Sequence, residues 1–444
     1  MTNPRRVAAL LAALLLALVV AACGDDDDEG AAAGGQAQTA TQANRDVSGN
    51  VSVMAVWSGP EQAAFQAVLD DFKERYPNVE VRYDSAGDQL PTVLSTAVEG
   101  GNPPDLAVLP QPGLLRQFQA RNALQPIDFV KDTIEQDFGT DWVRLGTVDG
   151  ELYGLVFKAA NKSTVWFNRH VFEDAGVEPP QTWDEFLGNA DTIRASGTPP
   201  YSVAGADGWT LTDLFENIYL RTAGPEKYDQ LARHEIPWTD ESVITALEEM
   251  RKVLGDPEDI AGGRRGALQT EFPESVSQLF SEPPQAAQVM EGDFVGGVIL
   301  ESTDAQPQQD FDVFAFPSFE GGPENAVVGG GDTVVMFNDT PATRALVEYL
   351  ATADAAEIWA RRGGFASPNR QVDPTIYPDE ITRKTATALA EAEVFRFDMS
   401  DLAPAEFGAT PGRGEWKVLQ DFLSDPDVEQ TARALERAAE RAYE

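Results

Sequence analysis

Residues 51–109 are VSVMAVWSGPEQAAFQAVLDDFKERYPNVEVRYDSAGDQLPTVLSTAVEGGNPPDLAVL, and this stretch decides the fold. The run from Val51 to Trp57 is typical of a buried strand, and Ser58-Gly59-Pro60 supplies a turn with proline at a first helical position. Apolar residues then recur at helical spacing up to Tyr76, and they alternate along 79–83. A helical segment at 92–99 and a strand at 105–109 follow. This order indicates a parallel sheet with helical crossovers.

The rest of the chain continues the mixed pattern of helices and strands. We expect a strand pair within 152–168, a helix opening at Trp183 and a helix over 209–220. Further expected elements are strands at 296–300 and 333–337, helices at 341–349 and 355–361, and an amphipathic helix over 426–443. We find no internal repeat. The sequence therefore predicts an α/β fold.

The first fifty residues have the pattern of an export signal followed by a tether. Arg5 and Arg6 precede an apolar run over 7–22, which is short for a membrane span and typical of a signal peptide. It ends in Val-Val-Ala-Ala-Cys23-Gly, which looks like a bacterial lipobox, in which the cysteine is lipidated. Residues 24–50 contain almost no large apolar side chain, so we expect a flexible acidic tether. We therefore expect residues 1–22 to be removed and Cys23 to anchor the protein to the membrane.

Composition excludes several classes of function. The chain has 444 residues, with 73 acidic against 33 basic side chains and a net charge of −40, which argues against nucleic-acid binding. One cysteine and two histidines permit neither an internal disulfide nor a zinc cluster of Cys/His type. We expect no metal and no cofactor.

Several local motifs resemble a known family. They are Gly101-Asn-Pro-Pro-Asp105, Asp149-Gly-Glu-Leu-Tyr-Gly154, Val165-Trp-Phe-Asn168 and Pro180-Gln-Thr-Trp-Asp-Glu-Phe186. With the lipobox, they are similar to the extracellular solute-binding proteins of carbohydrate ABC importers. Phe167 replaces the tyrosine that the family usually has. The segments 214–220, 291–295 and 395–399 resemble the alpha-glucoside-type subgroup.

The resemblance implies a two-lobed fold of the periplasmic-binding-protein type, with discontinuous α/β lobes joined by a hinge. Lobe one would comprise 51–158 with 333–365, and lobe two 159–332 with 366–444. Crossovers would lie near 158–161, 331–333 and 363–367. A sugar would bind between the lobes, which close on it by bending at these crossovers. The partners implied are a sugar and the permease subunits of an ABC transporter, and we expect a monomer.

Sugar binding calls for planar polar side chains facing hydroxyl groups and aromatic rings covering C–H faces. Strand ends and crossovers offer Trp57, Ser58, Glu61, Gln111, Lys158, Asn161, Asp332 and Phe365. The stacking positions of the family carry over to Trp209, Phe294 and Trp416. Asp213 lies one helical turn beyond Trp209, and Glu291 and Asp293 precede Phe294. Each aromatic residue has core packing as its alternative. Gly329-Gly330-Gly331 suggests a close backbone approach to a ligand, or hinge freedom.

Three other classes of protein remain open on the residues alone. An extracellular glycoside hydrolase would need two carboxylates across the scissile bond, and no motif singles out such a pair. The nucleophile motif Gly-x-Ser-x-Gly is absent, so we assign no catalytic residue. A binder of a non-sugar solute is also possible. A surface adhesion protein is disfavoured by the α/β order.

The lipobox predicts that replacement of Cys23 by Ser releases the protein from membranes without unfolding it, because the tether lies outside the folded body. Fractionation without detergent, followed by thermal melting of the released protein, tests this. A Cys23→Ser protein that stays with the membranes would contradict the assignment of a lipid anchor.

Overall fold

The computed structural model describes residues 44–443, so the predicted signal peptide, Cys23 and most of the predicted tether lie outside the described residues. The chain makes contacts with the body from its first described residue, since Asn44 donates its backbone N–H to the Arg75 carbonyl at 2.6 Å. The first strand begins at Gly49, two residues before the predicted one.

The larger sheet contains the strands predicted from residues 51–109. Its order is β2-β1-β3-β11-β12, with β6 paired to β11 as well. The strands are β1 (Gly49–Ala55), β2 (Val79–Ser85), β3 (Leu106–Leu109), β6 (Gly154–Asn161), β11 (Ala326–Met336) and β12 (Val394–Phe397). β1 runs parallel to both β2 and β3. The parallel arrangement predicted from the sequence is therefore confirmed.

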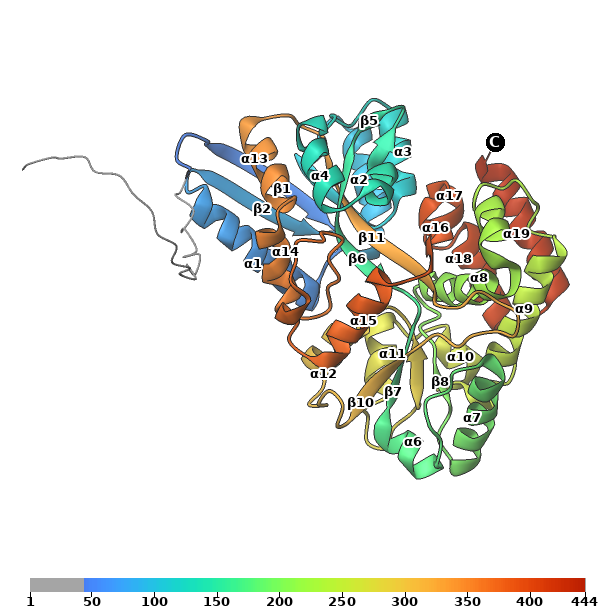
Figure 1. The fold of residues 1–444 in the computed structure, drawn as a ribbon. Coiled ribbons are helices and arrows are strands. Elements are labelled where there is room, and N and C mark those ends of the chain that lie inside the picture. The colour runs from blue at the N-terminus through green and yellow to red at the C-terminus, as the bar shows by residue number, and fades with distance from the viewer. Residues whose placement is uncertain (1–43, 444) are drawn as a thin grey trace, which may run out of the picture. The chain divides into compact units, whose positions relative to one another are not determined.

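Helices cover both faces of this sheet (Figure 1). One face packs against α1 (Gly59–Arg75), α4 (Lys131–Asp137), α5 (Thr140–Gly146), α13 (Pro341–Leu350) and α14 (Ala353–Ala360), and the other against α2 (Leu90–Glu99) and α3 (Pro112–Ala120). Alternate residues of β3 serve the two faces, because Val108 packs with the first group and Leu109 with the second. A short hairpin, β4 (Thr147–Val148) with β5 (Glu151–Leu152), precedes β6.

A second sheet has the order β10-β7-β9-β8 and a core of its own. Its strands are β7 (Thr164–Asn168), β8 (Tyr201–Ser202), β9 (Gln288–Met290) and β10 (Phe311–Ala315). One face packs against α6 (Arg169–Ala175), α7 (Trp183–Ser196), α8 (Trp209–Ala232), α9 (Glu241–Leu254), α10 (Gly263–Ala267), α16 (Met399–Leu402), α17 (Ala405–Gly408), α18 (Gly414–Ser424) and α19 (Val428–Tyr443). The other face packs against α11 (Phe272–Gln278), α12 (Val295–Ser302) and α15 (Glu380–Ala390).

Two sequence predictions about strands are wrong. Residues 296–300, predicted as a strand, belong to helix α12, in which Val295 and Ile299 lie one turn apart and are both fully buried. A short apolar run does not distinguish a strand from a buried helix. The two strands within 152–168 exist but do not pair with each other, because β6 pairs with β11 while β7 pairs with β9 and β10.

The three glycines of β11 allow close packing within the protein. A Cβ atom would lie 2.3 Å from the Phe395 ring at Gly329, 2.8 Å from Lys162 at Gly330 and 2.8 Å from Val156 at Gly331. These glycines have ordinary strand conformations, with no positive φ. The close approach predicted from the sequence is therefore to neighbouring side chains.

Trp359 of α14 lies in an aromatic cluster of the first core. Its ring is 4.7 Å from that of Trp57 and 5.2 Å from that of Phe365, and the side chain is 1% exposed. We expect Trp359→Ala to lower the free energy of unfolding by about 3–5 kcal/mol, because the cavity cannot be refilled. Val93→Ala is the control: Val93 is 41% exposed, so its loss should cost under about 1 kcal/mol. Equal denaturation midpoints for the two variants would contradict this assignment.

Candidate functional site

Several of the predicted residues lie around Lys158 of β6. Its ammonium lies 2.5 Å from Glu61 Oε1 and 3.9 Å from Asp332 Oδ2. Trp57 donates its indole N–H to the same Asp332 oxygen at 2.8 Å. The ammonium also lies 5.5 Å from the centre of the Phe294 ring. Five residues predicted from separate parts of the chain therefore form one group.

A second lysine, Lys162, which the sequence analysis missed, forms a group with the predicted residues Asp213 and Trp209 and with two further acids. Its ammonium is 3.0 Å from Asp213 Oδ1, 2.5 Å from Asp398 Oδ2 and 3.5 Å from Asp401 Oδ2. It also lies 5.9 Å from the centre of the Trp209 ring. A lone lysine directly after the predicted crossover was the available signal. Its partners at 398 and 401 lie more than 230 residues away in the sequence.

Three aromatic rings meet beside these lysines. Trp209 begins α8, and its ring lies 5.4 Å from Phe272 and 5.9 Å from Phe294. Phe272 and Phe294 contact each other edge to face at 5.3 Å. All three side chains are partly exposed. The structure thus brings together the predicted Trp209 and Phe294 and adds Phe272, which the sequence analysis missed.

Five of the predicted residues carry a buried polar atom that has no protein partner. Asp293 accepts the Asn161 backbone N–H through Oδ2 at 3.1 Å, while its Oδ1 has no partner. Asp213 Oδ2, Glu291 Oε2, Gln111 Oε1 and Trp416 Nε1 are also buried without a hydrogen-bond partner. Because burying such atoms unpaired is unfavourable, they are suited to hydrogen bonds with a bound molecule or water.

Three predicted residues make no side-chain hydrogen bond among the described residues. Ser58 is exposed before α1 and makes no capping hydrogen bond with its side chain. Phe365 is 1% exposed and stacks on Trp359 in the first core. Trp416 is only 3% exposed and packs so tightly against Gly208 that a Cβ there would lie 2.8 Å from the Trp416 Cβ. Neither Phe365 nor Trp416 has an exposed ring face here.

Burial raises the pKa of most of the carboxyl groups at the site. It raises the pKa of Asp293 to about 6, although the Asn161 N–H and Lys158 lower it. It also raises the pKa of Asp332 to about 6, although Lys158 lowers it. Burial also holds the pKa values of Asp213 and Glu291 well above their usual range. For Lys162, burial lowers the pKa, but its three carboxylate neighbours outweigh this and raise it overall.

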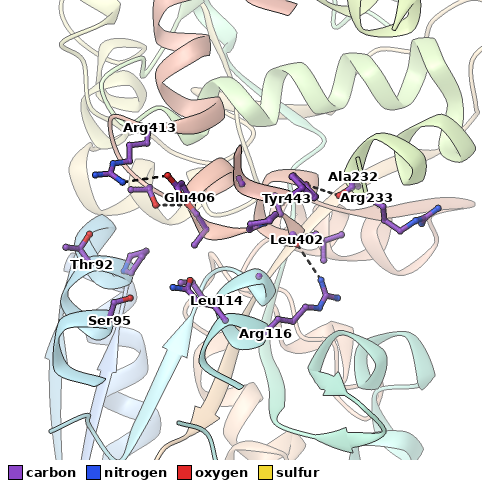
Figure 2. A pocket seen from close by; sticks show the side chains of 18 residues that line it. Thr92, Ser95, Leu114, Arg116, Ala232, Arg233, Leu402, Glu406, Arg413 and Tyr443 are labelled. Carbon is purple, nitrogen blue, oxygen red and sulfur yellow. Dashed lines mark hydrogen bonds and ion pairs between the residues drawn. The ribbon is translucent and has the colours of Figure 1, made fainter. Parts of the chain in front are cut away.

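A cavity of about 660 Å³ lies at a different place (Figure 2). Thr92, Ser95, Leu114 and Arg116 of α2 and α3 face Glu406, Arg413 and Tyr443 across it, and none of the fourteen predicted residues lines it. Arg116 donates to the Leu402 carbonyl at 3.5 Å, and the Tyr443 hydroxyl donates to the Ala232 carbonyl at 3.0 Å. The cavity lacks the buried unpaired polar atoms found at the predicted site.

The model of one protein family, "Bacterial extracellular solute-binding protein", matches residues 57–357, which is well over half of the chain. The chain belongs to this family of bacterial extracellular solute-binding proteins. The matched range contains the Lys158 group, the three aromatic rings, and the Lys162 group apart from Asp398 and Asp401. The resemblance stated from the local motifs is confirmed.

Two relatives match most of this chain. It is 34% identical over 394 residues to the "Osmoprotective compounds-binding protein GgtB" of Synechocystis, covering 87% of this chain and 92% of the relative. It is 33% identical over 409 residues to the "Alpha-glucosides-binding periplasmic protein AglE" of Rhizobium meliloti, covering 88% of each.

Solved structures share the fold at low sequence identity. The bacterial solute receptor AcbH superposes with a TM-score of 0.79 at 20% identity, covering 89% of this chain and 99% of that one. RafE in complex with raffinose gives 0.72 at 17% identity, covering 89% and 100%. The two-lobed α/β fold class predicted from the sequence is confirmed.

The described part of the chain contains no helix long and apolar enough to cross a membrane. Over the same residues, no group of three or more His, Cys, Asp or Glu side chains could hold a metal ion.

The raised pKa of Asp293 predicts a dependence of stability on pH. The folded state holds this proton up to about pH 6, whereas an unfolded aspartate loses it near 3.8, so stability falls as pH rises through this interval. Between pH 4 and pH 7 the free energy of unfolding should fall for both proteins. We expect the fall in Asp293→Asn to be smaller than in the wild type, by on the order of 1–3 kcal/mol. Urea unfolding at several pH values measures this, with the exposed Asp70→Asn as the control. Identical pH profiles for Asp293→Asn and the wild type would refute it.

Proposed function

We propose that this protein captures a sugar outside the cytoplasm and delivers it to the permease of an ABC importer. The observation that carries the proposal is the meeting of three partly exposed aromatic rings with buried oxygens that have no partner. Rings cover the C–H faces of a sugar, while carboxylate and amide groups bind its hydroxyls. A neutral polyol offers both surfaces at once.

The relatives support this choice of ligand. One is named for binding alpha-glucosides and another for osmoprotective compounds, and one of the similar structures contains raffinose. An alpha-glucoside is the sugar class that we propose. The protein acts as a binder and has no hydrolytic role, which agrees with a family defined by solute binding.

We propose that the ligand lies between two lobes that bend at the crossing strands. The lobes follow the division given above, 51–158 with 333–365 and 159–332 with 366–444, except that we propose residues 366–377 as part of lobe one. Support comes from β6 and β11, which lie side by side, and from the bridge between Ala159 and Ala366, which places the chain at residue 366 beside β6. Val372 and Tyr377 still pack in the first core and Ile381 packs in the second, so we place the third crossing between Tyr377 and Ile381.

The proposal also includes the membrane. We propose that a lipid on Cys23 keeps a monomeric binder near its permease and that the acidic segment after it links the lipid to the folded body. This agrees with the extracellular location named in the family description.

Trp209 is the residue that tests the location of the site. Loss of its ring removes the surface that covers a sugar face, on the order of 2–3 kcal/mol, so we expect Trp209→Ala to weaken binding roughly thirty- to a hundredfold. A thermal-shift screen with maltose, trehalose, sucrose and raffinose identifies the sugar, and calorimetric titration then measures its affinity.

The matched control is Arg116→Ala at the cavity of Figure 2, which should bind the sugar as the wild type does. Normal binding by Trp209→Ala with loss in Arg116→Ala would place the sugar in that cavity instead. Cleaved products after incubation with any of these sugars would contradict the binding role.

A further inference from the structure

Acidic side chains greatly outnumber basic ones at the candidate site. Lys158 and Lys162 are its two ammonium groups, and five carboxyl groups approach them: Glu61, Asp213, Asp332, Asp398 and Asp401. Glu291 and Asp293 add two more that form no ion pair among the described residues. Seven acids therefore share two bases in a place that is largely closed to water.

Three of these carboxyl groups keep a free oxygen. Asp213 Oδ2, Glu291 Oε2 and Asp293 Oδ1 have no hydrogen-bond partner, and the three residues are 1%, 3% and 6% exposed. Each of these oxygens accepts a hydrogen bond when its carboxyl group is ionised; burial raises the pKa of all three groups, and a bound cation lowers it again. The site therefore lacks hydrogen-bond donors far more than it lacks acceptors, and a ligand suited to it must supply donors.

The aromatic rings at the site are already positioned near positive charge. Lys158 lies 5.5 Å from the Phe294 ring and Lys162 lies 5.9 Å from the Trp209 ring. The ring of Phe272 contacts both rings, and no lysine or arginine lies over it in the described part of the chain. Because the face of an aromatic ring attracts a cation, the Phe272 ring offers such a face beside Trp209 and Phe294.

We propose that the site prefers a sugar that carries a protonated amine, such as an amino sugar or an amino-substituted glycoside, over the neutral sugar of the same shape. This deepens the proposed function and rests on it. One ammonium group brings three donors and one positive charge, whereas a hydroxyl brings one donor and no charge. Hydrogen bonds between charged groups are also roughly twice as strong as neutral ones.

The same surplus of acid excludes acidic sugars. A uronate would place a further carboxylate beside Asp213, Glu291 and Asp293, while Lys158 and Lys162 are already paired with other carboxyl groups. Burying a carboxylate without a cation partner is strongly unfavourable. The preferred order is therefore amine, then neutral sugar, then acid.

Calorimetric titration of the mature protein with matched glycosides tests this order. The probes are methyl α-D-glucoside, its 2-amino-2-deoxy and 6-amino-6-deoxy derivatives, and methyl α-D-glucuronide. We expect at least one amine to bind about tenfold more tightly than the neutral glycoside, and the glucuronide to bind at least a hundredfold more weakly. If the neutral glycoside binds and neither amine gains, the inference fails alone. If none of the four binds, the proposed function fails and the inference with it.

Variants show whether the preference arises at the site. Asp213→Asn and Glu291→Gln keep the side-chain shape and remove one negative charge, so the ratio of amine to neutral affinity should fall severalfold. Asp70→Asn changes the net charge equally on the exposed face of α1 and should leave that ratio unchanged. The ratio should also persist at 0.5 M salt, which screens the general field of an acidic protein. An equal loss of the ratio in Asp70→Asn, or its loss at high salt, would overturn the inference.

Discussion

Strands β6 and β11 lie side by side in antiparallel register, and the rest of the architecture depends on this pairing. β11 belongs to both cores, because Ala326 and Val328 pack with the second while Val334 and Met336 pack with the first. The glycines between these pairs let neighbouring side chains and backbone come close. The same register sets Asp332 opposite Lys158, so one backbone ladder joins the cores and assembles the first charged group of the site.

The site works against the stability of the fold that surrounds it. Lys162 connects α8 with α16 through Asp213, Asp398 and Asp401, and breaking such a buried group is costly. Yet the acids are too many for the lysines, and several are kept in an unfavourable environment by the packing around them. A binding site that presents unpaired groups to its ligand gives up stability in the empty protein.

The features that the sequence predicted correctly are those set by residues close together in the chain. The parallel strands within 51–109 follow from local periodicity and turns, and so does the placing of Trp57, Glu61 and Lys158 near strand ends. The sequence did not predict Lys162, because its partners come from distant segments. It also missed the burial of Trp416, because the close approach of Gly208 to that side chain is a tertiary contact. Residues 296–300 were assigned to a strand because a short run of apolar residues fits the repeat of a buried strand and that of a buried helix equally well.

The place of β11 between β3 and β6 has a consequence for the order in which the chain folds. During synthesis, β1, β2 and β3 emerge early, but the strand that pairs with β3 and β6 is made more than 160 residues after β6. Until then both strands keep a free edge, which invites pairing with other chains. The contacts that complete the first sheet are therefore of long sequence separation, which makes folding slow. No single cut in the chain yields the first sheet alone, because β11 completes it only after all four strands of the second sheet have been made.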